Sequence, residues 1–302
     1  MQDLIEKARH RRRGMIGAGT DAFRLFDGAG DGLPGVFIDV LAGHWLVQTR
    51  DRDFPEGLTV DSLASCRSLW WKRLERSERE APRCLGGDGP AGEFAIYQNG
   101  CRFLLDFTAG YSQGIFLDQR LNRARVSERC GRGSRILNLF AYTCAFSVVA
   151  AAAGAETASV DLSGRYLEWG KRNFAANDLE PSAHGFVRGD ALAWLRRWGK
   201  KGTSFDGVIL DPPTFSRSGK GKVFRVEKDS RALAALAAGV LAPRGWILFS
   251  SNCRSLLPDA FQAMVLAGLA DAGREVSGVQ ARPMPGEYRG EKYLKSLWIE
   301  VA

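Results

Sequence analysis

The chain lacks the residue clusters that metal sites and disulfide-rich domains need. Its 302 residues include only three histidines, and its six cysteines stand apart without a CxxC pair. Zinc sites are built from closely spaced Cys and His, and small disulfide scaffolds need dense cysteine. We therefore predict no metal site and no disulfide framework.

Long apolar runs are also missing. The longest, around residues 145–153, is far shorter than the roughly 20 residues that cross a bilayer. The N-terminal sequence MQDLIEKARHRRRG has no apolar core of the kind that signal peptides carry. We expect a cytoplasmic protein that does not associate with a membrane.

Positive charge is in excess. The chain has 42 Lys and Arg against 34 Asp and Glu, a formal net charge of +8. This charge favours a polyanionic partner such as a nucleic acid, although a merely basic globular protein would carry it too. Hydrophobic residues make up 45% of the sequence, which is ordinary for a folded protein with a packed core.

The sequence pattern divides the chain into two parts. Residues 21–50 alternate apolar and polar side chains between Gly- and Pro-rich turns, which predicts antiparallel strands, and residues 57–76 carry apolar residues at helical spacing. Residues 77–93 are charged and then rich in Gly and Pro, as expected of a connection. We predict a small α+β domain over residues 1–93 and a second domain over 94–302.

After a predicted hairpin at 94–107, strands and helices alternate. We predict strands at 135–139, 157–161, 185–188, 205–210, 246–250, 276–280 and 296–301. Helices are expected after Thr143, Ser163 and Asp190, and over 227–241 and 258–272. This alternation is typical of an α/β fold, in which a mainly parallel sheet carries helices on both faces and binds ligands at the carboxyl ends of its strands.

Polar side chains lie at four of these carboxyl ends: Asn138, Asp161, Asp190 and Asp211. Asp161 comes about 20 residues after the first loop, where a carboxylate bonds ribose hydroxyls in dinucleotide folds; capping of the next helix is the alternative. Asp211 precedes two prolines, which end its strand in a rigid turn. That turn can hold a flat ring against Phe215, or it can simply terminate the strand.

Five segments together resemble one family: QGIFLDQR, ILNLFAYTCAFS, SVDLSGRYLEWGKRNFAAND, GDALAWL and DPPTFSRSGKGKVFRVEKD, in this order. From about Gly100 the chain resembles class I S-adenosylmethionine-dependent methyltransferases. It is most similar to the bacterial ribosomal RNA methyltransferases of the large subunit, which modify cytosine at carbon 5 or guanine at nitrogen 7. The resemblance implies a Rossmann-like sheet, mostly parallel with the last strand antiparallel, and S-adenosylmethionine as cofactor.

The resemblance also implies roles for individual residues. The methionine end of the cofactor would be held by Asn138, Phe140, Ala141, Tyr142 and Thr143. The ribose and adenine would be held by Asp161, Leu162, Asp190 and Ala191, and the methyl-transfer position would be lined by Asp211, Pro212, Pro213 and Phe215. Where many relatives have glycine, this chain has Phe140, Tyr142 and Cys144, and the family usually keeps the third glycine. We expect the cofactor to bind, with Cys144 either fitting beside it or crowding it.

The identity of the methylated atom depends on a cysteine. Carbon 5 of cytosine becomes nucleophilic only after a thiolate adds to the ring, whereas nitrogen 7 of guanine has a free lone pair. In the cytosine-modifying relatives a Cys stands where this chain has Asn252, and Cys253 follows one position later. We predict guanine nitrogen 7 over cytosine carbon 5. Cys253 is either a nucleophile or a buried apolar residue.

The implied partner is RNA, most specifically 23S rRNA or an assembly intermediate of the large subunit. The sequence does not decide between a monomer and a homodimer. The small N-terminal domain would lie on the side of the protein that faces the RNA substrate. Phosphate contacts are expected from Arg11, Arg12, Arg13, Lys220, Lys222 and Arg225, the last three on a flap over the site. Trp70 and Trp71 either stack on bases or belong to the core.

Two rival functions share features with this chain. A nicotinamide-dependent dehydrogenase would share the fold and Asp161 but should show a GxGxxG turn, which the loop at residues 138–146 lacks. The second rival is a catalytically inactive RNA-binding or ribosome-assembly protein on the same fold. Cys144 favours this rival, whereas the set of Asp161, Asp190 and Asp211 opposes it.

Overall fold

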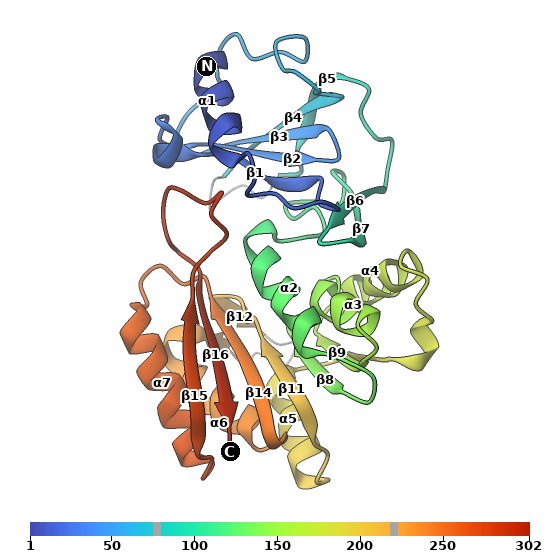
Figure 1. Ribbon diagram of the computed structural model, residues 1–302, viewed down its shortest axis with the longest axis vertical. Helices are drawn as coiled ribbons and strands as arrows, with labels where there is room; N and C mark the ends of the chain where they lie inside the picture. Colours follow the sequence, from blue (N-terminus) through green and yellow to red (C-terminus); the bar gives the residue numbers. More distant parts are fainter. Residues whose placement is uncertain (75–79, 218–222) are drawn as a thin grey trace. The chain divides into compact units, whose positions relative to one another are not determined.

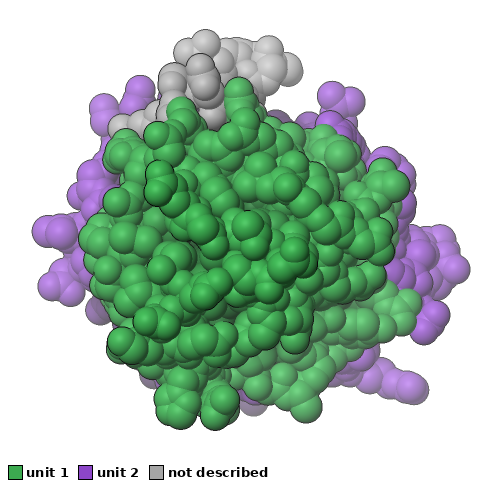
Figure 2. Space-filling model, turned by 90° about the horizontal axis from the view of Figure 1, so that it is seen from above, with its two compact units in different colours: residues 1–121, 285–292 green, residues 122–284, 293–302 purple. Residues whose placement is uncertain are grey.

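The computed structural model describes residues 1–74, 80–217 and 223–302 (Figure 1). The chain forms two compact units, coloured green and purple in Figure 2. Unit 1 comprises Met1–Leu121 and Pro285–Lys292, and unit 2 comprises Asn122–Met284 and Tyr293–Ala302. This division differs from the expected boundary at residue 93. In the part of the chain that the structure describes, no helix combines the length and apolarity needed to cross a membrane.

Unit 1 contains a five-stranded sheet with one N-terminal helix. Helix α1 (Gln2–Arg12) precedes β1 (Ala22–Asp27), the short 3-10 helix η1 (Gly28–Asp31), β2 (Val36–Leu41), β3 (His44–Thr49), β4 (Ser68–Arg73) and β5 (Arg83–Gly87). The strand order is β1-β2-β3-β4-β5, antiparallel except for the parallel pair β3–β4. The expected connection at 77–93 therefore contains strand β5.

The helix predicted over residues 57–76 is wrong, because Ser68–Arg73 forms strand β4. Leu69 and Trp71 are buried in the same core cluster as Ile5 of α1. Trp70 is also buried and stacks on Phe107, with 4.4 Å between ring centroids. Both faces of this strand are covered, so the apolar and polar alternation that marks a strand is absent from its sequence.

The hairpin of β6 (Phe94–Gln98) and β7 (Cys101–Leu105) was expected, but it belongs to unit 1. The backbone N–H of Asp21 donates to the carbonyl of Tyr97 at 3.0 Å, and the N–H of Tyr97 donates to the Asp21 carboxylate at 2.6 Å. Phe94 packs on Phe107 at 5.0 Å. These contacts extend unit 1 beyond residue 93, through the short 3-10 helix η2 (Leu117–Gln119).

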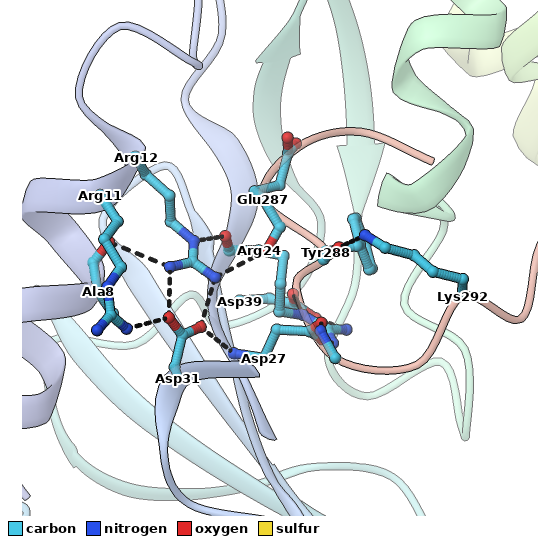
Figure 3. Close-up of polar contacts among 11 residues, drawn as sticks. Ala8, Arg11, Arg12, Arg24, Asp27, Asp31, Asp39, Glu287, Tyr288 and Lys292 are labelled. Atoms are coloured by element: carbon cyan, nitrogen blue, oxygen red, sulfur yellow. Dashed lines mark hydrogen bonds and ion pairs between the residues drawn. The ribbon is translucent and has the colours of Figure 1, made fainter. Parts of the chain in front are cut away.

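The C-terminal segment Pro285–Lys292 is held in unit 1 by hydrogen bonds and by a buried ion pair, and Figure 3 shows its contact with Arg12. Arg12 pairs with Asp31 at 2.6 Å and donates to the carbonyl of Glu287 at 2.7 Å. The Glu287 carboxylate is fully buried and accepts hydrogen bonds from Arg120 at 2.8 to 3.0 Å. This corrects the expectation for Arg12, because its side chain is buried and its N–H groups are engaged inside unit 1.

Unit 2 contains a seven-stranded sheet in the order β10-β9-β8-β11-β14-β16-β15 (Figure 1). The strands are β8 (Arg135–Leu139), β9 (Glu156–Asp161), β10 (Gly185–Arg188), β11 (Phe205–Leu210), β14 (Leu241–Ser251), β15 (Val276–Arg282) and β16 (Lys295–Val301). Strand β16 runs antiparallel to both of its neighbours, β14 and β15, and the other neighbouring pairs are parallel. The predicted Rossmann-like sheet, mostly parallel with an antiparallel last strand, is confirmed.

The helices of unit 2 are α2 (Arg120–Arg129, which begins in unit 1), α3 (Ala145–Ala152), α4 (Gly164–Ala175), α5 (Ala191–Lys200), α6 (Val226–Ala238) and α7 (Pro258–Asp271), with the 3-10 turn η3 (Pro181–Ala183). All but α2 and η3 lie close to where the periodicity placed them. Leu195, Leu233 and Phe261 bring α5, α6 and α7 into one core cluster with the strands. The small hairpin of β12 (Phe215–Arg217) and β13 (Val223–Arg225) was not expected as strands.

Candidate cofactor site

The loop that follows β8 has a left-handed backbone at three residues that are not glycine. The φ angles are 58° at Phe140, 50° at Tyr142 and 61° at Cys144. This conformation costs an L-residue roughly 1–2 kcal/mol, so surrounding bonds must hold it. The N–H groups of Ala141 and Tyr142 donate to the Val160 carbonyl at 3.0 Å and to the Asp161 carboxylate at 2.9 Å.

Cys144 points into the protein interior. It is fully buried, its thiol lies 3.8 Å from the carbonyl oxygen of Tyr142, and burial raises its pKa to about 12. Gly170 of α4 leaves the room for this side chain, because a Cβ at residue 170 would stand 2.9 Å from the Cβ of Cys144 and closer still to its Sγ. The packing against Gly170 favours a neutral, structural cysteine over one that projects from the loop.

Asp161 ends β9 with both carboxylate oxygens anchored. One oxygen accepts from the N–H of Tyr142 at 2.9 Å and the other from the N–H of Ser163 at 2.8 Å. Burial raises the pKa of this carboxyl, and the two backbone N–H groups oppose that rise. The hydrogen bonds fix the carboxylate in orientation, while its remaining lone pairs can accept from a ligand.

Asp161 and Asp190 share one pocket. Asp190 is the N-cap of α5 and accepts from the N–H of Ala193 at 2.9 Å. The pocket has about 280 Å³ of space, part of it open to solvent, and is lined by Phe140, Val160, Asp161, Leu162, Gly189, Asp190, Ala191, Leu192, Ser216 and Phe224. Two carboxylates beside apolar walls fit a nucleoside, whose hydroxyl and amino groups donate and whose base is flat and apolar on its faces.

Some of the predicted cofactor residues line this pocket and others do not. Phe140, Asp161, Leu162, Asp190 and Ala191 line it. Two others, Asn138 and Thr143, are buried and form hydrogen bonds with residues that pack against the loop. The Asn138 amide donates to the Ser147 hydroxyl at 2.9 Å, and the carbonyl of Thr143 accepts from the Asn173 amide at 2.9 Å.

Five lining residues were not predicted: Val160 and Gly189, which directly precede Asp161 and Asp190, and Leu192, Ser216 and Phe224. Leu192 follows Ala191 on α5, and Ser216 and Phe224 lie on the two strands of the β12–β13 hairpin. The ring of Phe224 lies 5.7 Å from that of Phe140. The expected flap therefore contributes a hydroxyl and an aromatic ring to the pocket wall. The β-branched and aromatic pair Val223 and Phe224 could have indicated this strand.

Comparison with known proteins identifies the family of this chain. The profile of the S-adenosylmethionine-dependent methyltransferase family matches residues 59–276. The chain belongs to this family. The expected enzyme class and cofactor, S-adenosylmethionine, are confirmed.

Two relatives and a solved structure similar to this methyltransferase cover between 73% and 99% of it. Ribosomal RNA large subunit methyltransferase I of Aeromonas salmonicida is 32% identical over 96% of this chain and 76% of its own length. Ribosomal RNA large subunit methyltransferase K of Neisseria meningitidis is 36% identical over 73% of this chain and 61% of its own. A crystal structure of a methyltransferase candidate complexed with S-adenosylhomocysteine is 28% identical, with a TM-score of 0.87 over 99% of this chain and 80% of its own.

The DPP turn of the methyltransferase follows β11. Pro212 is buried, whereas Asp211 is half-buried and Pro213 is exposed. The Thr214 hydroxyl donates to the amide oxygen of Asn252, at the end of β14, at 3.0 Å. Phe215 is 47% exposed, and the guanidinium of Arg225 lies 5.2 Å from the centre of its ring. The turn thus presents an amide, a hydroxyl and an aromatic ring together.

Cys253 is buried beside an acidic side chain. It is 2% exposed, and its Sγ lies 3.6 Å from Glu227 and 3.3 Å from the hydroxyl of Ser255. Its carbonyl accepts from Lys295 at 2.6 Å. Of the two neighbours at the end of β14, Asn252 contacts the DPP turn and Cys253 contacts the start of α6. The alternation of side chains near a strand end accounts for this difference.

The predicted RNA-binding residues of the methyltransferase fall into three groups. Lys220 and Lys222 lie outside the described residues. Arg11, Arg13 and Arg225 are exposed. Arg12 is buried and bonded within unit 1, so its side chain does not face a phosphate.

Proposed function

We propose that this methyltransferase transfers a methyl group to nitrogen 7 of a guanine in RNA of the large ribosomal subunit, 23S rRNA. The names of the relatives from Aeromonas salmonicida and Neisseria meningitidis support the RNA class. The observation that carries the choice of atom is the orientation of Asn252 and Cys253. Because the substrate is ribosomal RNA, we place the protein in the cytoplasm.

The pocket residues are proposed to hold the cofactor through its nucleoside. Asp161 accepts from the ribose hydroxyls and Asp190 from the adenine amino group, while Leu162 and Ala191 contact the base. Residues 138–143 surround the methionine end. S-adenosylmethionine supplies an electrophilic methyl group carried on a sulfonium. The protein's contribution is alignment, worth roughly 7–11 kcal/mol when reacting atoms are held about 3 Å apart.

The arrangement at the turn favours guanine. A cytosine mechanism needs a thiol that can reach the base, but Cys253 is buried, with its Sγ 3.6 Å from Glu227 and 3.3 Å from the Ser255 hydroxyl. Asn252 instead stands against Thr214 of the turn, where its amide can hydrogen-bond a base edge. Nitrogen 7 has its own lone pair, so Asp211, Pro212 and Pro213 have only to position the ring.

RNA contacts are proposed for the exposed groups. Phe215 and the guanidinium of Arg225 form a stacking surface for a base that has left its helix. Arg11, Arg13, Arg225 and the two lysines of the flap, Lys220 and Lys222, would bind phosphates. The rival function, an RNA-binding protein without catalysis, loses its main support because Cys144 packs against Gly170 and is not among the residues lining the pocket.

The test is methylation of unmodified 23S rRNA with labelled S-adenosylmethionine, followed by mass spectrometry of the nucleosides. We expect 7-methylguanosine, and we expect Cys253→Ser to retain activity within about twofold, because the thiol does not touch the base. Asn252→Ala should lose activity. Appearance of 5-methylcytidine, together with an inactive Cys253→Ser variant of normal stability, would contradict the assignment. No transfer despite cofactor binding would favour the rival.

A further inference from the structure

A second pocket lies within unit 1, at the end of the sheet where β3 and β4 begin. It has about 520 Å³ of space, part of it open to solvent, and is lined by Ala42, His44, Arg67, Asp88, Gly89, Pro90, Phe94 and Ala95. These residues come from the β2–β3 turn, the start of β3, the residue before β4, the segment after β5 and strand β6. None of them belongs to the proposed cofactor site.

Two glycines bring the walls of this pocket together. Gly43 has φ of 83°, and a Cβ there would stand 2.9 Å from Cδ of Arg67. Gly87 has φ of 82°, and a Cβ there would collide with the backbone at Arg67 and Ser68. Backbone hydrogen bonds of 2.8 Å join Arg67 to Gly43 and Asp88 to Arg67. The main chain that carries Arg67 and Asp88 is therefore fixed.

The two charged side chains are available to a ligand. Arg67 and Asp88 are both exposed, and with the described residues neither side chain forms an ion pair or a hydrogen bond. The buried His44 lines the same pocket, and its Nδ1 is 2.8 Å from the Ser68 hydroxyl. Burial lowers the pKa of His44; Arg67 lowers it further, and Asp88 opposes the change. Near neutral pH the imidazole is uncharged.

Part of the pocket wall is aromatic. Phe94 is half-buried, its ring centroid is 5.0 Å from that of His44, and the two rings meet edge to face. A flat ligand in the pocket can contact Phe94 and Pro90. Arg67 supplies donors in a planar fork, and Asp88 supplies two parallel acceptors. An isolated phosphate suits the pocket poorly, because the Asp88 carboxylate would repel it.

Guanine matches this set of groups best among the bases. Its O6 and N7 accept from an arginine fork, and its N1–H and exocyclic amino group donate in parallel to a carboxylate. Adenine and cytosine offer a single amino donor group on this edge, and uracil offers one N–H. We propose that this pocket binds an unpaired guanine of the RNA substrate, separate from the methylated base. The inference rests on RNA being the substrate.

Titration of the full chain with the four nucleoside 5′-monophosphates tests the proposal. We expect guanosine monophosphate to bind about tenfold or more tightly than the adenosine form, because a bidentate pair is worth about 1–3 kcal/mol of discrimination. Asp88→Asn should reduce this preference to about twofold, since its amide N–H₂ faces the guanine donors. Arg67→Ala should weaken binding of guanosine monophosphate about tenfold.

The control is Arg52→Ala, which removes one exposed positive charge near the opposite end of β3 and should leave the preference unchanged. Each variant must retain its melting temperature. Equal binding of all four nucleotides, competition by inorganic phosphate at equal strength, or an unchanged preference in Asp88→Asn would overturn the proposal. Methylation of 23S rRNA is measured separately. Methyl transfer without a preference for guanosine monophosphate would refute only the proposal for this pocket. A preference for guanosine monophosphate without methyl transfer would refute only the proposed activity.

Discussion

Replacing Gly170 by alanine tests the packing that accommodates Cys144. In a helix interior this change ordinarily stabilises by roughly 1 kcal/mol, because alanine has less backbone freedom to lose. At Gly170 the new Cβ would stand 2.9 Å from the Cβ of Cys144 and closer to its Sγ. Overpacking of this kind costs about 1–3 kcal/mol. We therefore expect Gly170→Ala to lower the free energy of unfolding by up to about 2 kcal/mol, or to leave it unchanged.

The effect should change sign when residue 144 is glycine. Glycine adopts the φ of 61° found at Cys144 without strain, and it removes the atoms that the new methyl group would meet. In a Cys144→Gly background, Gly170→Ala should therefore stabilise by about 1 kcal/mol. The interaction free energy between the two positions would then be about 1–3 kcal/mol, which a double-mutant cycle measures.

Urea unfolding of the unmodified chain, the two single variants and the double variant gives these free energies. Calorimetric titration with S-adenosylhomocysteine measures cofactor affinity, which reports on the conformation of the loop. Cofactor affinity should fall in Gly170→Ala and recover in the double variant, because a displaced Cys144 disturbs the loop that ends at it. Gly199→Ala is the matched control: it lies in α5, with open space where its Cβ would be. If Gly170→Ala stabilises equally in both backgrounds, the thiol does not lie against Gly170 and the reasoning fails.

Three further predictions follow from the same contacts. Asp161→Ala should abolish measurable S-adenosylhomocysteine binding in calorimetry; retained micromolar affinity would remove this residue from the proposed site. Glu287→Gln should lower the free energy of unfolding by about 3 kcal/mol, because it leaves the Arg120 charge buried without its partner; an unchanged urea midpoint would contradict that. Burial lowers the pKa values of His44 and His184, so the unfolded chain binds more protons below about pH 6.5 and stability should fall there. The fall between about pH 7.5 and 5.5 should be smaller in His44→Gln, and an equal fall would exclude His44 as a cause.

Periodicity predicted unit 2 well because each element there carries its own local signal. The strands β8 and β11 are short apolar runs, with Asn138 one residue before the end of β8 and Asp211 directly after β11. The helices α4 and α5 are amphipathic, with Ser163 and Asp190 as side-chain caps. These signals depend only on neighbours in the sequence. The same reasoning failed for β4, where burial of Trp70 and Trp71 on opposite faces removes the alternation.

The site was predicted in part for the same reason. Asp161, Asp190 and Phe140 were found because they stand at strand ends or in the loop between a strand and a helix, and all three line the pocket. Ser216 and Phe224 were missed as lining residues because their place depends on how a hairpin folds over the sheet. Arg12 looked like part of a basic cluster, and only its buried partners Asp31 and Glu287 reveal its structural role.

The sequence alone determined the α/β class, the order of the main strands and helices of unit 2, the cofactor family and the acidic residues at the strand ends, because these follow from local periodicity and from motifs with fixed spacing. The tertiary structure decided where the two units divide, which way Cys144 and Cys253 point, and that Gly170 makes room for a cysteine in a left-handed loop. These features depend on residues distant in sequence. Close packing lets a side chain occupy only the space that such distant neighbours leave.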